Sequence, residues 1–185
     1  MVRMSTLDER AAIRFQLALP GLPALTVGLS QLKTDIGDWT KFWMQRFAPL
    51  FYVHVQQDFV LEGGGSGASW APLSPAYAQW KASRFPGRGI LVRSGALKAS
   101  LSGPEAPRSV FRPGPTSLDI GTRVPYALHH QVGSSRMPQR PPLRVSPAFM
   151  RAVGLHMRSH IQEAWVERRT AFIADVRAGL SERLR

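Results

Sequence analysis

Residues 39–60 read "WTKFWMQRFAPLFYVHVQQDFV" and form the most aromatic run of the chain. Trp39, Trp43 and Phe47 recur at four-residue steps, and apolar residues continue this pattern upstream. Apolar side chains spaced three and four apart lie on one face of a helix, and such a stripe is typical of a helix packed in a core. The sequence therefore predicts a helix over about residues 27–48 whose aromatic face is buried.

A proline follows directly behind this stripe, at position 49. Proline lacks a backbone N–H, and its ring clashes with the preceding turn of a helix. We therefore expect the helix to break or kink at Pro49 and a second helical segment to continue to about Val60.

Two further regions predict β-structure. Residues 12–19, "AIRFQLAL", alternate apolar and polar side chains as a half-buried strand does, and "PGLP" ends the pattern. Residues 108–112 and 117–121 flank "PGPT" and predict a β-hairpin in which Leu118 and Ile120 face inward. Together with the helices, these strands predict an α+β fold with a small antiparallel sheet packed against helices.

The stretch "WAPLSPAYAQWK", residues 70–81, follows the glycine-rich loop "GGGSG". Its aromatic side chains could form an exposed binding platform or part of the core. Ser74 can cap a helix and Pro75 suits the first helical position, so we expect a short helix over residues 74–84.

We interpret this helix as fixed to the body of the domain by its aromatic and aliphatic residues. Trp70, Leu73 and Tyr77 are the side chains expected to hold it there. Trp80 and Lys81, or the glycine-rich loop, would then face a neighbouring molecule.

Further short elements follow along the chain. "FPGRG" reads as a turn, and residues 95–101 as a short helix. Residues 125–133 predict one or two helical turns closed by Gly133. The basic, proline-rich segment "SSRMPQRPPLRV" predicts an extended loop.

From Pro147 the sequence is helical to its end. Apolar residues step by four along it: Phe149, Val153, Met157, Ile161 and Trp165, and then Phe172, Val176 and Leu180. A strict step of four drifts around a helix of 3.6 residues per turn, so one straight partner cannot cover the whole stripe. Such a helix would be about 58 Å long at 1.5 Å per residue. We therefore expect a single domain over residues 1–146 and, over 147–185, a long helix whose distal half packs on a neighbouring subunit.

The formal charge of +12 is concentrated in the middle of the chain. Residues 84–151 hold eleven lysines and arginines against two acidic residues, Glu105 and Asp119. This basic region suits a solvated surface, an acidic protein partner or nucleic acid. The N-terminus lacks the order of a signal peptide, and no apolar window is long enough to span a membrane.

The sequence has few of the features that are typical of an enzyme. It contains no cysteine, which excludes disulfides, thiol catalysis and cysteine-based metal sites. Nucleophile-elbow, Walker and zinc-protease motifs are absent. His156 and His160 have the i, i+4 spacing of a metal face but lack nearby carboxylates other than Glu163. We therefore expect no catalytic residues, no metal and no cofactor or small-molecule substrate.

Several motifs nevertheless occur in a defined order. Phe59 to Gly63 leads into Trp70, Pro72, Leu73, Tyr77 and Lys81, and "ILVRSGALKASL" (90–101), "VPYALHHQVG" (124–133) and "PQRPPL" (138–143) follow. This order resembles the bacteriophage virion morphogenesis, or tail completion, family of Mu- and P2-like phages over about residues 55–145. The resemblance implies a structural, non-enzymatic protein of the head–tail joining region, located in the virion and assembled in the host cytoplasm.

The resemblance also implies ring assembly of the chain with itself and contacts with neighbouring neck, tail terminator or connector proteins, near the genome but without a membrane. The residues expected as family-motif or core anchors are Trp70, Pro72, Leu73, Tyr77, Leu91, Gly95, Leu97 and Tyr126. Those expected to face partners are Arg136, Arg140, Arg144, Trp80, Lys81, His129 and Gln131. Two alternatives stay open: an assembly factor that leaves before the particle matures, and a basic DNA-binding protein that contacts the genome end.

Overall fold

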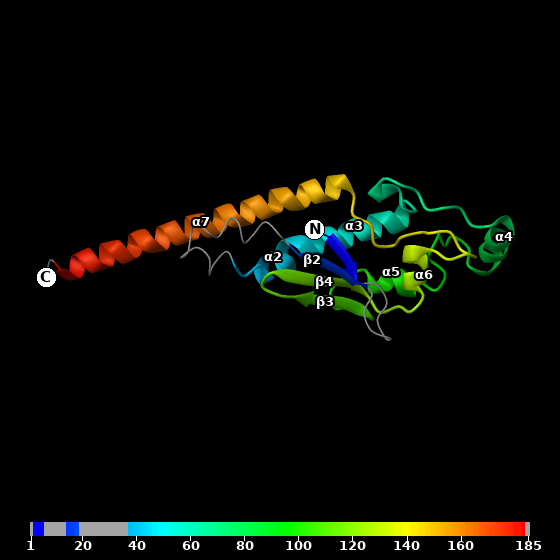
Figure 1. The fold of residues 1–185 in the computed structure, drawn as a ribbon, viewed down its shortest axis with the longest axis horizontal. Coiled ribbons are helices and arrows are strands. Elements are labelled where there is room, and N and C mark those ends of the chain that lie inside the picture. The colour runs from blue at the N-terminus through cyan, green and yellow to red at the C-terminus, as the bar shows by residue number, and fades with distance from the viewer. Residues whose placement is uncertain (1, 6–13, 19–36, 184–185) are drawn as a thin grey trace.

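The computed structural model describes residues 2–5, 14–18 and 37–183 of the chain. It is an α+β fold, as the sequence predicts, in which an antiparallel sheet packs against helices and a long C-terminal helix runs past the body (Figure 1).

The sheet has four antiparallel strands in the order β1-β2-β4-β3. Their bounds are Val2–Ser5 for β1, Arg14–Ala18 for β2, Ser109–Pro113 for β3 and Ser117–Thr122 for β4. The predicted hairpin is confirmed, and Leu118 and Ile120 are buried as expected. The strand expected over 12–19 is confirmed for the residues that the structure describes. The first strand, β1, has no counterpart among the sequence-based expectations.

The aromatic stretch forms one continuous helical run. It consists of α2 (Thr40–Phe42), the π-helical turn η1 (Trp43–Phe47) and α3 (Ala48–Val60). The expectation of a helix from about residue 27 is wrong for Gly37–Trp39, which are not helical, and residues 27–36 lie outside the described part. Asp38 explains the start, because its Oδ1 accepts a hydrogen bond from the Thr40 backbone N–H at 2.8 Å.

The second helical segment expected here is α3, which ends at Val60 as predicted, although Pro49 does not break the run between the two segments. Pro49 lies at the first turn of α3, directly behind the π-helical turn, where the Ala48 N–H bonds to the Trp43 carbonyl five residues back. A π-turn carries one extra residue, so the irregularity falls where the proline removes a donor and crowds the preceding turn. The π-helical turn and Pro49 thus disturb the same part of the helix, and the helical run continues beyond them.

The helical run carries the core. Trp39, Trp43, Phe47 and Phe51 are buried with Leu118 and Ile120 of the sheet, as the aromatic stripe predicts. The rings contact one another mainly edge to face, the arrangement favoured by aromatic quadrupoles, as in the Trp43–Phe47 pair at 5.6 Å. The α2–α3 run therefore packs its aromatic face against the sheet.

Three short helices lie at one end of the body (Figure 1). They are α4 (Pro75–Arg84), α5 (Ala96–Ser100) and α6 (Ala127–Val132), all in places that the sequence predicts. Gly133 ends α6 with φ +75°, as expected. Ser74 occupies the N-cap position of α4, but its side chain makes no capping hydrogen bond, so this expected contribution is missing.

Helix α7 extends from Pro147 to Arg183, which confirms the long C-terminal helix. Phe149 and Val153 of its apolar stripe are buried, Met157 and Ile161 are partly buried, and Trp165 is 50% exposed. This loss of burial along the helix is the result expected from a four-residue step that drifts around the helix. Among the described helices, none has an apolar stretch of the length needed to cross a membrane.

Candidate functional site

The motif residues of the sequence meet at the end of the body formed by α4, α5, α6 and the loop of residues 134–146 (Figure 1). Two segments far apart in the chain, residues 70–72 and 140–143, are hydrogen-bonded to each other there. We call this contact the loop junction.

Trp70 supplies one half of the loop junction. Its side chain is 5% exposed, and its ring meets that of Phe59 edge to face at 5.4 Å. The indole Nε1 donates to the Pro141 carbonyl at 3.1 Å, and the backbone N–H donates to the Glu62 carbonyl at 2.7 Å. Trp70 is therefore a core residue that also fixes the proline-rich loop.

The glycine-rich loop makes this burial possible. Gly63 has φ +90°, a conformation that favours glycine. A Cβ at this position would lie 2.7 Å from Trp70 Cδ1 and 2.9 Å from the Ala68 carbonyl. The backbone of Gly63 and the Trp70 ring thus lie closer together than any side chain at position 63 would allow.

Arg140 supplies the other half of the loop junction. Its Nε donates to the Ala71 carbonyl at 2.6 Å and its Nη2 to the Pro72 carbonyl at 2.8 Å. The side chain is 6% exposed, so these bonds lie mostly out of solvent. Arg140 was expected to face a partner, but the structure places its guanidinium on the protein's own backbone.

Gln131 holds the same loop from α6. Its Nε2 donates to the Leu143 carbonyl at 2.9 Å, and its Oε1 accepts from the Leu143 N–H at 3.1 Å. The Gln139 side chain in turn donates to the Gln131 carbonyl at 2.8 Å. Gln131 is buried, so this residue too turns inward rather than toward a partner.

Lys81 is the third residue expected at a partner surface that the structure buries. Its Nζ donates to the Gly89 carbonyl, while Glu62 beside it accepts the Ile90 N–H at 2.7 Å. Burial lowers the pKa of Lys81, and the neighbouring Glu62 carboxylate opposes part of that shift. These contacts fasten the loop after α4 to the end of α3.

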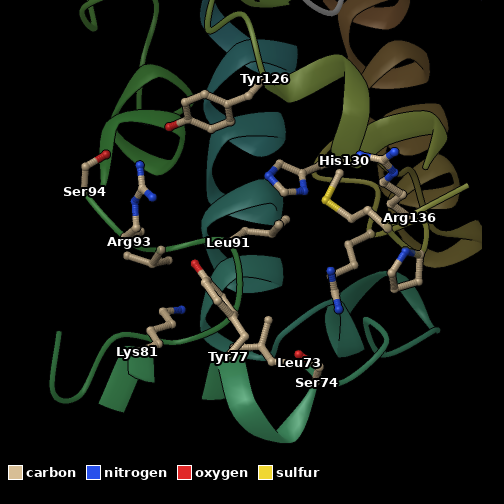
Figure 2. A pocket seen from close by; sticks show the side chains of 14 residues that line it. Leu73, Ser74, Tyr77, Lys81, Leu91, Arg93, Ser94, Tyr126, His130 and Arg136 are labelled. Carbon is tan, nitrogen blue, oxygen red and sulfur yellow. The ribbon is translucent and has the colours of Figure 1, made fainter. Parts of the chain in front are cut away.

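A pocket of about 530 Å³ opens between α4, the loop of residues 91–94, α6 and the loop of residues 136–140 (Figure 2). The lining residues are Leu73, Ser74, Tyr77, Lys81, Leu91, Val92, Arg93, Ser94, Tyr126, His130, Arg136, Met137, Pro138 and Arg140. None of them is acidic, and four carry a lysine or arginine side chain. We call it the basic pocket.

His130 stands in the wall of the basic pocket without a hydrogen-bond partner for its Nδ1 within the part of the chain that the structure describes. Burial, and then the charges of Arg140 and His129, lower the pKa of His130. The imidazole is therefore neutral at neutral pH. A neutral ring with an unused nitrogen can receive a hydrogen bond or, once protonated, donate one.

The other predicted residues in and just before α4 are exposed or only half-buried. Tyr77 is 39% exposed and Trp80 43% exposed, and their rings stack at 5.4 Å. Tyr77 was expected in the core but instead lines the basic pocket. Leu73 is half-buried and Pro72 is exposed. Trp70 is therefore the residue of this motif that reaches the core.

The other motif residues also divide between the core and the basic pocket. Leu97 is fully buried on α5, with Gly95 at its N-cap at φ +84°. Leu91 lines the pocket at φ +62°, a left-handed conformation that is rare for leucine. Tyr126 is 40% exposed at the pocket rim.

The three remaining residues expected to face a partner are exposed: Arg136, which lines the basic pocket, His129 and Arg144. The Arg144 side chain lies away from the basic pocket, in the wall of a smaller hollow beside Trp70. The structure therefore does not bring Arg136, Arg140 and Arg144 together on one surface.

Two features of this region were missed by reasoning from the sequence. Arg93 lines the basic pocket, although nothing in "LVRSG" distinguishes it from other arginines. Asp58 is fully buried under the glycine-rich loop, and none of the residues that the structure describes makes a hydrogen bond of good geometry to either carboxylate oxygen. Burial raises the pKa of Asp58, an effect that nearby Ser66 and His54 offset only in part.

The described residues contain no group of three or more histidine, aspartate and glutamate side chains placed to bind a metal ion. His160, one of the two histidines with metal-face spacing, contacts the rings of Trp39 and Phe42, each at 5.5 Å. Burial lowers its pKa.

A family model described as the phage virion morphogenesis family matches residues 23–162, well over half of the chain. The chain belongs to this family. The match includes the loop junction and the basic pocket and ends within α7, so Trp165 and the rest of the distal helix lie outside it. A search of curated proteins and a search of solved structures each gave no significant match.

Proposed function

We propose that this member of the phage virion morphogenesis family is a structural protein of the head–tail joining region, of the tail completion or neck type. It works without catalysis, by assembling into a ring and by docking on neighbouring neck, tail terminator or connector proteins. Family membership supports a role in building the virion, and the shape of α7 supports the role in assembly.

The observation that carries the proposal is the length and exposure of α7. Its first turns pack on the body through Phe149 and Val153, and Arg46 of the π-helical turn pairs with Glu163 at 2.9 Å. Beyond that pair, Trp165 and Val166 are 50% and 60% exposed. The segment from residue 165 to 183 adds about 28 Å of helix at 1.5 Å per residue.

Figure 1 shows this part of α7 running beyond the end of α2 and away from the sheet. A helix that exposes a tryptophan and continues its apolar stripe can bury that stripe by packing on another subunit. Residues 147–185 would thus join one subunit to the next in the ring.

Removal of the gene from the phage tests this proposal. We expect filled heads and separate tails to accumulate, visible by electron microscopy, because the two parts do not join. Wild-type gene supplied from a plasmid restores joined, infectious particles. Normal joined particles in its absence would overturn the proposal, and so would a defect confined to the heads before DNA packaging.

A DNA-binding role is the second candidate, and the charge of +12 favours it. A gel shift at low and at moderate salt separates the two. Contact with the genome end predicts a band that stays shifted at moderate salt, whereas a structural role alone predicts at most a low-salt shift that moderate salt removes.

A further inference from the structure

The basic pocket gathers positive charge that the protein itself does not neutralise. Lys81, Arg93, Arg136 and Arg140 line it, and the described residues offer no carboxylate in its wall. Glu62 does not line the pocket, but its charge offsets part of the effect of burial on the pKa of Lys81. The guanidinium groups of Arg93 and Arg136 have no hydrogen-bond or ion-pair partner among the described residues. Like charges held together in a concave site favour an anionic ligand.

The pocket has fixed walls and two exposed charges. Arg140 is fixed by the Ala71 and Pro72 carbonyls and Lys81 by the Gly89 carbonyl. Figure 2 shows Arg93 and Arg136 on opposite sides of the hollow. A ligand in the pocket would therefore meet one exposed arginine on each side without rearranging the buried cations.

The lining of the pocket also includes apolar side chains. Leu73, Leu91 and Met137 line it, and Tyr77 stands between the charged residues (Figure 2). Its volume of about 530 Å³ lies in the range of sites that enclose a small ligand or a few side chains. The lining thus suits a segment that carries both carboxylates and an aliphatic side chain.

An acidic peptide fits these features better than DNA. Arginine binds carboxylates in a planar, bidentate geometry, and clusters of arginine are a recurring means of recognising acidic motifs. Single-stranded nucleic acid requires an open basic track with aromatic side chains free to stack on successive bases. Here the rings of Tyr77 and Trp80 stack on each other. A duplex is far wider than this pocket.

We propose that the basic pocket binds an acidic segment of a neighbouring virion protein, with Arg93 and Arg136 binding its carboxylates and Leu73 and Leu91 contacting an apolar side chain between them. This inference rests on the proposed function for the origin of the segment. The chemistry of the pocket can be tested without it.

The test is fluorescence anisotropy with the full chain and the labelled peptide Glu-Glu-Leu-Glu-Glu. We expect saturable binding that weakens with salt, and no binding of Gln-Gln-Leu-Gln-Gln. Arg93→Gln and Arg136→Gln should each weaken binding by about five- to tenfold, less than the loss of a buried charge-assisted hydrogen bond because both side chains are partly solvated. Arg84→Gln is the matched control, because Arg84 is exposed on α4 outside the pocket, and it should leave the affinity unchanged.

Two results would overturn the inference. One is a peptide affinity that is equal in the wild type and in the Arg93→Gln/Arg136→Gln double variant, or no binding at all. The other is tighter binding of a labelled single-stranded oligonucleotide that the double variant loses, which would assign the pocket to phosphate. The inference and the proposed function can fail separately. If deletion of the gene prevents joining but phage carrying the double variant still joins heads and tails, the proposed function holds and this inference does not.

Discussion

Replacement of Trp70 by alanine tests whether this residue holds the loop junction or forms an exposed platform. Loss of a buried tryptophan costs about 3–5 kcal/mol of stability. That figure includes the edge-to-face contact with Phe59, which contributes about 0.5–1.5 kcal/mol. The Pro141 carbonyl also loses its donor; an unpaired acceptor costs about 1–3 kcal/mol when fully buried, and less for this partly buried carbonyl. Because the terms overlap, we expect Trp70→Ala to cost about 4–5 kcal/mol.

The assay is thermal and denaturant unfolding of the purified chain. For a protein of this size, about 4 kcal/mol corresponds to a fall in Tm of about 8–16 °C. Trp70→Phe keeps most of the ring and loses the indole N–H, so it should cost about 1–2 kcal/mol. Trp80→Ala is the matched control: the same residue type is 43% exposed and stacks on Tyr77, which predicts a loss of about 1 kcal/mol.

A Trp70→Ala variant with unchanged stability would refute this reasoning. If that variant also failed to complete particles, Trp70 would belong to a binding surface. Equal losses in Trp70→Ala and Trp80→Ala would likewise contradict the assignment of the first residue to the core and the second to the surface.

Three further substitutions test the junction and its surroundings. Arg140→Lys should lose about 1–3 kcal/mol in denaturant unfolding, because a single ammonium cannot replace the guanidinium on two carbonyls, and full stability would contradict the junction. Gly63→Ala should cost about 1–3 kcal/mol because of its φ of +90° and the close Trp70 ring, whereas Gly103→Ala, with open space around its Cβ, should cost little. Asp58→Asn should raise stability at pH 8. Burial raises the pKa of Asp58 in the folded chain, so the wild type loses stability as pH rises from the unfolded value of 3.8 through the folded pKa. The difference between the two proteins should vanish below pH 3.8, and an equal difference at both pH values would refute the assignment.

Periodic patterns accounted for most of the fold. The four-residue steps of the aromatic stretch and of α7 predicted two long helical runs, and the alternation around "PGPT" predicted the β3–β4 hairpin. These signals are local, because each depends on residues a few positions apart. The π-helical turn before Pro49 was not predicted, since a proline in a helical pattern indicates a break unless the preceding turn widens.

The site could be predicted only in part. Arg136 and Arg140 look alike in the sequence, yet one is exposed at the pocket and the other is buried on the Ala71 and Pro72 carbonyls. Their different environments are set by a chain segment almost seventy positions away, which no local pattern reveals. For the same reason Arg93 was overlooked as a pocket residue. The order of the motifs pointed to the right family, but it did not show which motif residues touch one another.

The most direct test of the structural role is quantitative mass spectrometry of purified, mature virions. A neck or tail completion protein that assembles as a ring is predicted in every particle, at a fixed ratio to the other proteins of the head–tail junction. Absence of the chain from mature virions, together with its presence in assembly intermediates, would contradict this account and identify an assembly factor that leaves before maturation.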